Sequence, residues 1–305
     1  MGRVITLGSV NQDITVTTQR FPAAGETLTG SSVSYRLGGK GANQAAAAAH
    51  AGAESVFVGL VGDDAPGAML REGLERHGVD TRRLGTVAGG SSGTAHITVD
   101  ASGENTIIVV PGTNRLVDAA LLDRIVPPLA ASDVLVLQGE VPLAADVAAA
   151  RAARGVGAVV ILNLAPAVPL DEGVLRLLDV LIVNETEAGI VLGGPAPRSR
   201  DEAASAARRL VGRGPGHVLI TLGADGAVWS DGPRAGSVPA PPVEAVVDTT
   251  GAGDAVVGVL AAGLAAGLGF PEAVRAAVRA GSLSVGRAGA ADSYGTFELE
   301  EVSRG

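Results

Sequence analysis

The sequence predicts an α/β protein of three layers, in which helices cover both faces of a mostly parallel central sheet. Short apolar runs of strand length alternate along the chain with longer amphipathic or alanine-rich segments. This repeated order of strand and helix is typical of parallel sheets, because parallel neighbours need crossover connections. Two regions alternate polar and apolar residues without helical spacing, and they predict a smaller, additional sheet.

The strands expected in the central sheet are apolar along their whole length, as strands covered on both faces are. They are Val4–Leu7, Ser55–Leu60, Val134–Leu137, Val159–Leu162, Val180–Val183 and Val218–Leu222. The helices expected around them are Gly67–His77, Asp118–Leu129, Leu143–Arg154, Asp201–Gly212 and an apolar, buried helix over Ala255–Leu268. Pro239–Pro242 is expected to connect into a further strand before Asp248.

The small sheet is expected from about residues 13–35 and 91–110. Within the second region, Thr94–Asp100 and Asn105–Val110 flank a Gly103-Glu104 turn, which predicts a hairpin. We expect this sheet to project from one domain that spans residues 1–305.

Composition excludes several classes of function. Of the 305 residues 47% are hydrophobic and only 2% aromatic, so a large core must be aliphatic. The net charge of −9, without a basic stripe, argues against nucleic-acid binding. Since there is no cysteine, disulfides, thiolate catalysis and cysteine-zinc sites are excluded, and the four histidines share no metal-ligand spacing. No signal-peptide pattern and no convincing membrane span are found, so we expect a cytoplasmic protein.

The most informative motif is Asp248–Asp254, which reads Asp-Thr-Thr-Gly-Ala-Gly-Asp and precedes the apolar helix. Glycines at a helix start let a ligand approach the backbone, and the free amides and dipole there attract anions. Asp254 would stand in that field, where a carboxylate suits a base that deprotonates an alcohol during phosphoryl transfer. Taken alone, the motif could equally be a turn with an aspartate cap.

A second motif, Gly38–Ala45, contains the chain's single lysine in a glycine-rich turn. The other 22 of the 23 basic residues are arginine, so the retention of Lys40 favours a pocket that needs a compact ammonium group. The spacing is not that of a Walker A loop.

Polar side chains also follow several expected strands, at the sheet edge where open α/β proteins bind ligands. The residues are Asn11 and Asp13, Glu140, Asn184 and Glu187, and Thr221, Gly223 and Gly226. Three of these groups have a plain structural alternative. Asn11 and Asp13 could form an Asx turn, Asn184 and Glu187 a helix cap with a capping box, and Thr221–Gly226 a hairpin turn.

Together these motifs resemble those of the ribokinase-like (PfkB) family of carbohydrate kinases, nearly from end to end. The resemblance implies that fold, with the small sheet as a lid over the sugar, and ATP-dependent phosphorylation of a sugar's terminal hydroxyl. Three more stretches, Gly25–Leu28, Gly103–Thr106 and Asn163–Ala167, are most similar to members that act on the 5-hydroxyl of D-ribose.

The resemblance also implies a role for each motif residue. Asp254 would be the base, and the amides of Gly251, Ala252 and Gly253 would hold the transferring phosphoryl group. Asn184 and Glu187 would organise Mg²⁺ and the phosphates through water. The sugar would be held by Asn11, Asp13, Gly39, Lys40, Asn43 and Glu140, and ATP by Thr221, Leu222, Gly223, Gly226 and Gly253.

Members of the family also bind a monovalent cation, here expected to be K⁺, beside the phosphoryl site. Asp248 and Thr250 match one side of it. The other side would come from carbonyls of Ser284, Arg287 and Gly289 and the hydroxyl of Ser293. The family's usual Gly-Ala-Gln-Pro-Ser reads Gly289-Ala-Ala-Asp-Ser293 here, so that Asp292 replaces a proline.

Other functions stay open at this point. Deoxyribose, a ketohexose, a keto-deoxy sugar acid or a nucleoside are alternative substrates, although the shortage of aromatic residues disfavours a nucleoside. A sugar-binding regulator without activity would be expected to lack the base, and a nicotinamide enzyme would need a Gly-x-Gly-x-x-Gly after the first strand. The resemblance further implies a homodimer formed through the lid.

Overall fold

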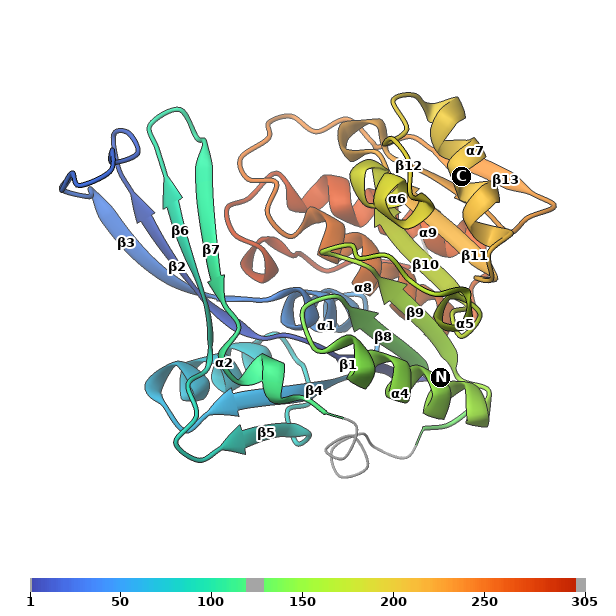
Figure 1. The fold of residues 1–305 in the computed structure, drawn as a ribbon, viewed down its shortest axis with the longest axis horizontal. Coiled ribbons are helices and arrows are strands. Elements are labelled where there is room, and N and C mark those ends of the chain that lie inside the picture. The colour runs from blue at the N-terminus through green and yellow to red at the C-terminus, as the bar shows by residue number, and fades with distance from the viewer. Residues whose placement is uncertain (1, 119–128, 300–305) are drawn as a thin grey trace.

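The computed structural model describes residues 2–118 and 129–299. It contains a large sheet of order β13-β12-β11-β10-β9-β8-β1-β4-β5 and a separate four-stranded sheet of order β3-β2-β6-β7 (Figure 1). The strands of the large sheet are β1 (Val4–Leu7), β4 (Ser55–Gly62), β5 (Leu84–Val87), β8 (Val134–Gln138), β9 (Val159–Asn163), β10 (Val180–Asn184), β11 (His217–Thr221), β12 (Ala227–Ser230) and β13 (Ala235–Val238).

The large sheet is parallel except at one edge. All pairings from β11 to β5 are parallel, whereas β12 pairs antiparallel with both β11 and β13. The six expected strands are all present. Sequence analysis missed β5, β12 and β13, which are short and lie at the two edges of the sheet.

Helices cover both faces, as predicted, and bury two aliphatic cores. One face is covered by α1 (Lys40–His50), α2 (Ala65–Arg76), α8 (Ala252–Ala265) and α9 (Phe270–Ser284), and the other by α4 (Leu143–Val156), α5 (Glu172–Leu175), α6 (Glu185–Leu192) and α7 (Arg200–Val211). Helix α8 tolerates its many small residues because it packs closely on α1: a Cβ on Gly258 would lie 2.4 Å from the carbonyl oxygen of Gln44. The helix expected at Asp118–Leu129 falls almost wholly outside the described residues.

The strand expected before Asp248 is wrong, because residues 239–251 contain neither helix nor strand. Pro241 and Pro242 lie in this segment, and proline cannot donate a ladder hydrogen bond. The resulting loop runs past the start of α8, where it contributes to a cavity instead of a sheet.

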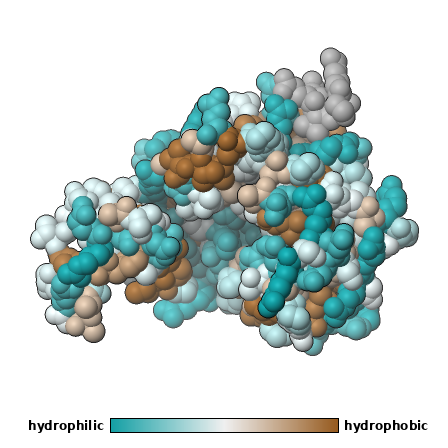
Figure 2. Space-filling view, turned by 90° about the horizontal axis from the view of Figure 1, so that it is seen from above, coloured by the Kyte–Doolittle hydropathy of each residue, from teal (hydrophilic) through white to brown (hydrophobic). Residues whose placement is uncertain are grey.

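The small sheet consists of β2 (Asn11–Thr17), β3 (Ser32–Gly38), β6 (Gly93–Val99) and β7 (Asn105–Val110). The expected hairpin is present as β6 and β7, paired from Thr94 with Val110 to Val99 with Asn105. The sheet stands away from the rest of the molecule, and Figure 2 shows a hollow with hydrophilic residues between the two. No helix among residues 2–118 and 129–299 is both long and apolar enough to cross a membrane.

Candidate active site

The start of α8 forms a turn with unused backbone donors. Gly251, its N-cap, has φ 78° and ψ 0°, a left-handed conformation that glycine adopts without strain. The Ala252 amide closes the turn onto the Thr249 carbonyl at 3.3 Å, whereas the amides of Gly251 and Gly253 donate to no residue in the described part of the chain. These donors, together with the helix dipole, can bind an anion.

Asp254 lies in the first turn of α8, next to these amides, and is only 6% exposed. Two amide side chains of α1 orient its carboxylate. Asn43 Nδ2 donates to Oδ2 at 3.0 Å, and Gln44 Nε2 donates to Oδ1 at 2.9 Å. The helix contact between α1 and α8 therefore brings the two sequence motifs together at the carboxylate.

Glu140 follows β8 and lies against the start of α1. Its Oε2 accepts hydrogen bonds from the Ser9 hydroxyl at 2.5 Å and from the Lys40 amide at 3.1 Å. The carboxylate is thus held with its second oxygen available to a ligand. Ser9, which sequence analysis did not single out, is 1% exposed and fixes this acid from the end of β1.

Asp13 lies on β2, at the base of the small sheet, and its carboxylate packs over Gly38. A Cβ on Gly38 would come within 2.2 Å of that carboxylate, so the glycine leaves room for it. Burial and the negative charges of Glu140 and Asp254 raise the pKa of Asp13 to about 7. Three carboxylates therefore share one electrostatic environment.

Lys40 supplies the positive charge of this environment. The charge of Asp254 raises the pKa of Lys40 most, burial lowers it, and Glu140 and Glu187 raise it further. The ammonium group therefore stays charged near three acids that belong to α8, to the loop after β8 and to α6. A compact ammonium group among three acids explains why a lysine is retained in this glycine-rich turn.

Asn11 is buried and is held by a side chain absent from our predictions. Asn114 Nδ2 donates to Asn11 Oδ1 at 2.8 Å, and Asn114 Oδ1 accepts from the Val10 amide at 3.1 Å. The glycine-rich turn lies beside it: Gly39 has φ 88°, and a Cβ there would lie 2.9 Å from the Asn11 amide. The backbone of the turn can therefore approach this asparagine closely.

A cavity of about 470 Å³ lies on the other side of the anion-binding turn. Thr221, Gly223, Gly226 and Gly253 line it, together with aliphatic side chains and prolines of the loop at 240–246 and of α8 and α9. Its volume and largely apolar lining are typical of a small-molecule binding site. Leu222 is 8% exposed and packs into the core beneath the sheet edge, so it does not line this cavity with the other four.

Asn184 and Glu187 form the capping box that we considered as the structural alternative. Asn184 Oδ1 accepts from the Glu187 amide and Glu187 Oε2 from the Asn184 amide, both at 2.8 Å. The pKa of Glu187 lies above its usual value, because burial raises it more than the Asn184 hydrogen bond and the Lys40 charge lower it. The second oxygen of Glu187 remains available, which fits a Mg²⁺ ion that keeps most of its water.

Asp248 connects the two segments expected to hold a monovalent cation. Its Oδ1 accepts from the Thr250 amide at 2.9 Å and its Oδ2 from the Gly289 amide at 2.8 Å. Burial alone would raise the pKa of Asp248, but these hydrogen bonds and the nearby Arg36 charge hold it below the usual value. The carbonyls of Arg287 and Gly289 accept no hydrogen bond from the described residues, so oxygen donors for a cation are present.

Two other expected cation ligands already have hydrogen-bond partners. The Ser293 hydroxyl donates to the Ala290 carbonyl at 2.7 Å, and the Ser284 carbonyl accepts from the Arg287 amide at 3.4 Å. Asp292, the departure from the family pattern, lies 3.5 Å from His77 Nε2. Among the described residues, no group of three histidine or acidic side chains is placed to bind a metal by side chains alone.

The fold and this site are typical of one class of protein: an α/β phosphotransferase, in which a helix start with free amides lies beside a buried carboxylate. The comparisons agree, since residues 1–296 match the model of the pfkB family of carbohydrate kinases. The chain belongs to this family, and it is therefore an ATP-dependent carbohydrate kinase.

Three relatives are similar to this chain over nearly its whole length. The chain is 37% identical over 290 residues to a ribokinase of Haemophilus influenzae, covering 95% of this chain and 94% of the other. It is 35% identical over 296 residues to a deoxyribokinase of Salmonella typhi, covering 97% and 96%. The structure of an Arabidopsis thaliana ribokinase complexed with ribose and ATP has a TM-score of 0.88, 30% identity and coverage of 100% of this chain and 98% of that one.

Four residues of the site escaped sequence analysis. Gln44 and Asn163 lie inside motifs that we quoted, and their hydrogen bond at 3.0 Å was not predictable because they are separated by 119 positions. Ser9 and Asn114 gave a weaker signal: Ser9 lies two positions before Asn11, and Asn114 follows the expected hairpin that ends at Val110.

Proposed function

We propose that the chain transfers the γ-phosphoryl group of ATP to the 5-hydroxyl of D-ribose, giving ribose 5-phosphate and ADP. The observation that carries this proposal is the position of Asp254: a carboxylate held by Asn43 and Gln44 in the first turn of a helix whose N-cap amides are free. A base and an anion-binding turn are thus adjacent, with the carboxylates of Asp13 and Glu140 close to the base and the cavity of about 470 Å³ beside the turn.

The mechanism follows from this placement. Asp254 accepts the proton of the sugar hydroxyl while the oxygen of that hydroxyl attacks the γ-phosphorus of ATP. The bond from this phosphorus to the β,γ-bridging oxygen breaks, and ADP leaves. The amides of Gly251, Ala252 and Gly253 stabilise the negative charge on the transferring group. The Ala252 amide can join them by giving up its long 3.3 Å bond to Thr249.

The sugar is bound by groups that can each make paired hydrogen bonds to a polyol. Carboxylate oxygens come from Asp13 and Glu140, and an amide group comes from Asn11. The backbone of Gly39, the ammonium group of Lys40 and the free amide oxygen of Asn43 complete the set. Asn43 Oδ1 is buried without a partner among the described residues, so it can accept a hydrogen bond from a sugar hydroxyl.

Mg²⁺ and K⁺ complete the proposed site. Glu187 and Asn184 would hold hydrated Mg²⁺, which neutralises phosphate charge. Asp248, Thr250, Ser284, Arg287, Gly289 and Ser293 would surround K⁺. Because Asp248 accepts the amides of both Thr250 and Gly289, a cation there would stabilise the segment that leads into the anion-binding turn.

We further propose that residues 1–305 act as one kinase domain and that the small sheet is its lid, which excludes water from the reacting groups. Its outer strand β7 exposes four consecutive apolar residues, Ile107, Ile108, Val109 and Val110, each about half exposed or more. Because β7 is an edge strand, its exposed apolar residues favour a protein interface there, and hydrophobic areas are visible on the projecting sheet in Figure 2. We infer a homodimer formed through the lids, acting in the cytoplasm, where ATP is available.

A second candidate is phosphorylation of 2-deoxyribose, which the similarity to a deoxyribokinase favours. Release of ADP from ATP and Mg²⁺ with a panel of sugars separates the two. Preferred turnover of D-ribose supports the proposal, and preferred turnover of 2-deoxyribose moves the specificity but keeps the mechanism. Sugar binding without ADP formation would contradict both.

A further inference from the structure

Tyr294 contacts the anion-binding turn directly. Its hydroxyl donates a hydrogen bond to the carbonyl oxygen of Gly251 at 2.8 Å, and the side chain is buried, with the residue only 4% exposed. Tyr294 follows a short 3₁₀ turn, Ala291–Ser293, which belongs to the segment expected at the cation site. The hydrogen bond therefore joins that segment to the start of α8.

The bonded carbonyl controls the geometry of the turn. Gly251 O also accepts the first helical hydrogen bond of α8, from the Ala255 amide at 2.8 Å. The Gly251 carbonyl and the Ala252 amide lie in one rigid peptide plane, so fixing the oxygen fixes the direction of the amide. The tyrosine adds a second restraint to the bond from Ala255, which matters because glycine has access to a wider range of backbone conformations than other residues.

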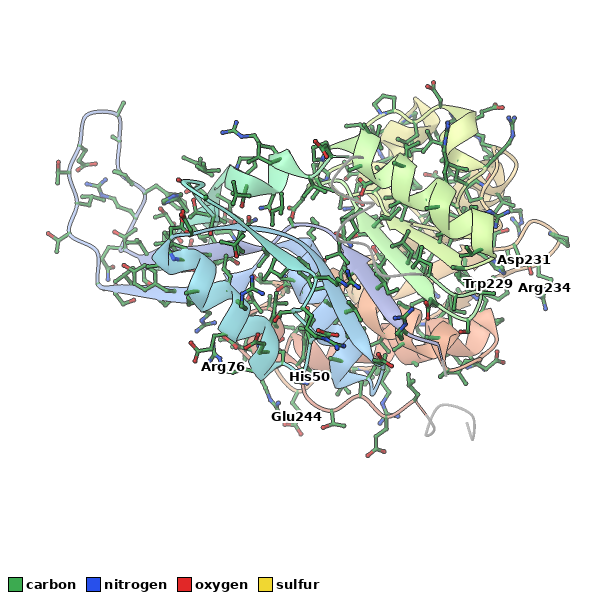
Figure 3. The ribbon with its side chains drawn as sticks, turned by 90° about the horizontal axis from the view of Figure 1, so that it is seen from below. His50, Arg76, Trp229, Asp231, Arg234 and Glu244 are labelled. Atoms are coloured by element: carbon green, nitrogen blue, oxygen red, sulfur yellow. The ribbon has the colours of Figure 1, made fainter. Side chains whose placement is uncertain are left out.

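The tyrosine is itself held in place by α1. Its ring packs edge-on against His50, with centroids 6.2 Å apart, and at a tilt against Phe297, with centroids 5.9 Å apart. His50 lies at the end of α1 (Figure 3), and its Nδ1 is 3.2 Å from the Gly295 carbonyl oxygen. The same helix orients Asp254 through Asn43 and Gln44, so α1 positions both the base and the tyrosine.

We propose that Tyr294 is a positioning residue for phosphoryl transfer, whose hydroxyl holds the Gly251–Ala252 peptide and with it the conformation of the turn, in which the amides of Gly251 and Gly253 are free. This inference rests on the proposed kinase function. Burial, with a smaller contribution from the Asp254 charge, raises the pKa of the Tyr294 phenol well above its usual value. The hydroxyl therefore remains a donor across the physiological pH range.

The test compares Tyr294→Phe with Ser205→Ala, which removes a hydroxyl from an exposed position on α7. In Tyr294→Phe the ring contacts remain and Gly251 O keeps its bond from Ala255. We expect kcat to fall about two- to tenfold, the effect of one lost neutral hydrogen bond, with the KM values for sugar and ATP nearly unchanged. Ser205→Ala should match the wild type.

A second readout separates positioning from a merely structural role. We expect Tyr294→Phe to bind ADP with wild-type affinity, but to bind ADP with aluminium fluoride and sugar more weakly by the same factor as the loss in kcat. A lower melting temperature with unchanged kcat and unchanged aluminium fluoride affinity would overturn the role of Tyr294. A wild type without turnover on any sugar would instead contradict the proposed function.

Discussion

Gln44 and Asp254, separated by 210 positions, are joined by a hydrogen bond of 2.9 Å from Gln44 Nε2 to Asp254 Oδ1. The same amide nitrogen lies 3.0 Å from Asn163 Oδ1, at the end of β9. Both Gln44 and Asp254 are buried, so the carboxylate is held between α1, α8 and the carboxyl edge of the sheet. The proposed base therefore has one orientation before any substrate arrives, so that little reorganisation would remain for catalysis.

Replacing Asp254 by asparagine should abolish most activity while leaving the fold intact. The amide has the same shape but cannot accept the hydroxyl proton, so kcat should fall by about 10²- to 10⁴-fold. ADP release at saturating D-ribose and ATP measures this effect. Asp201→Asn, on the exposed first turn of α7, serves as a matched control and should retain wild-type turnover. Comparable kcat values for the two variants would exclude Asp254 as the base.

Sugar affinity should depend on pH through Asp13, whose pKa is raised to about 7. The carboxylate accepts hydrogen bonds from hydroxyls and is replaced by the neutral acid as pH falls through 7, so the KM for sugar should increase between pH 8 and pH 6. Asp13→Asn should have a higher KM that no longer changes over this range. A wild-type KM that is constant from pH 6 to 8 would contradict this assignment.

The same residue predicts a change in stability of known sign. Because the folded state keeps the Asp13 proton up to about pH 7, while the unfolded chain loses it near pH 4, folding binds a proton between these values. The contribution of Asp13 to the free energy of unfolding therefore decreases as pH rises from about 4 to 7. We expect the melting temperature of Asp13→Asn, relative to the wild type, to be higher at pH 8 than at pH 4.5, as measured by calorimetry.

Potassium should accelerate turnover, and Asp248 should mediate the effect. Rates in K⁺ are expected to exceed those in a choline buffer of equal ionic strength. Asp248→Asn should lose this difference, because the amide has no net charge to attract the cation. Its nitrogen also cannot accept a hydrogen bond, so one of the two bonds from the Thr250 and Gly289 amides is lost. Equal rates of the wild type in K⁺ and in choline would show that the cation is not required.

The apolar patch on β7 should be needed for dimer formation. Ile108 is 69% exposed, and Ile108→Glu places a charge at the centre of the four exposed residues. Light scattering at micromolar concentration should give a dimer mass for the wild type and a monomer mass for the variant. Leu283→Glu, at a residue 54% exposed on α9, is the control and should leave the dimer intact. A wild-type monomer would contradict the lid interface.

Core stability near the sugar site should depend on Asn114, which is 1% exposed. Its side chain satisfies the Val10 amide and carbonyl and orients Asn11. Asn114→Ala leaves the buried Val10 amide unpaired, and we expect the free energy of unfolding to fall by about 1–3 kcal/mol. Denaturant unfolding checks this, with exposed Asn105→Ala as the control.

Much of the fold was accessible from the sequence because its signals are local. The six central strands could be recognised as apolar runs, and the start of α8 could be recognised from the Gly251–Asp254 motif. Edge strands such as β5 were missed because they are only four residues long and partly exposed. The strand expected before Asp248 is absent. Pro241 and Pro242 cannot donate ladder hydrogen bonds, and residues 239–251 form a loop.

The sequence by itself determined the fold class, the family and the residue types of the site, since each of these depends on patterns within a few neighbouring positions. Only the tertiary structure decided which groups meet. The packing of α1 on α8 joins Gln44 to Asp254, the end of β1 brings Ser9 to Glu140, and the segment after Ser293 carries Tyr294 to Gly251. Hydrogen bonds act over about 3 Å, and contacts between residues more than 40 positions apart at that range depend on how whole elements pack.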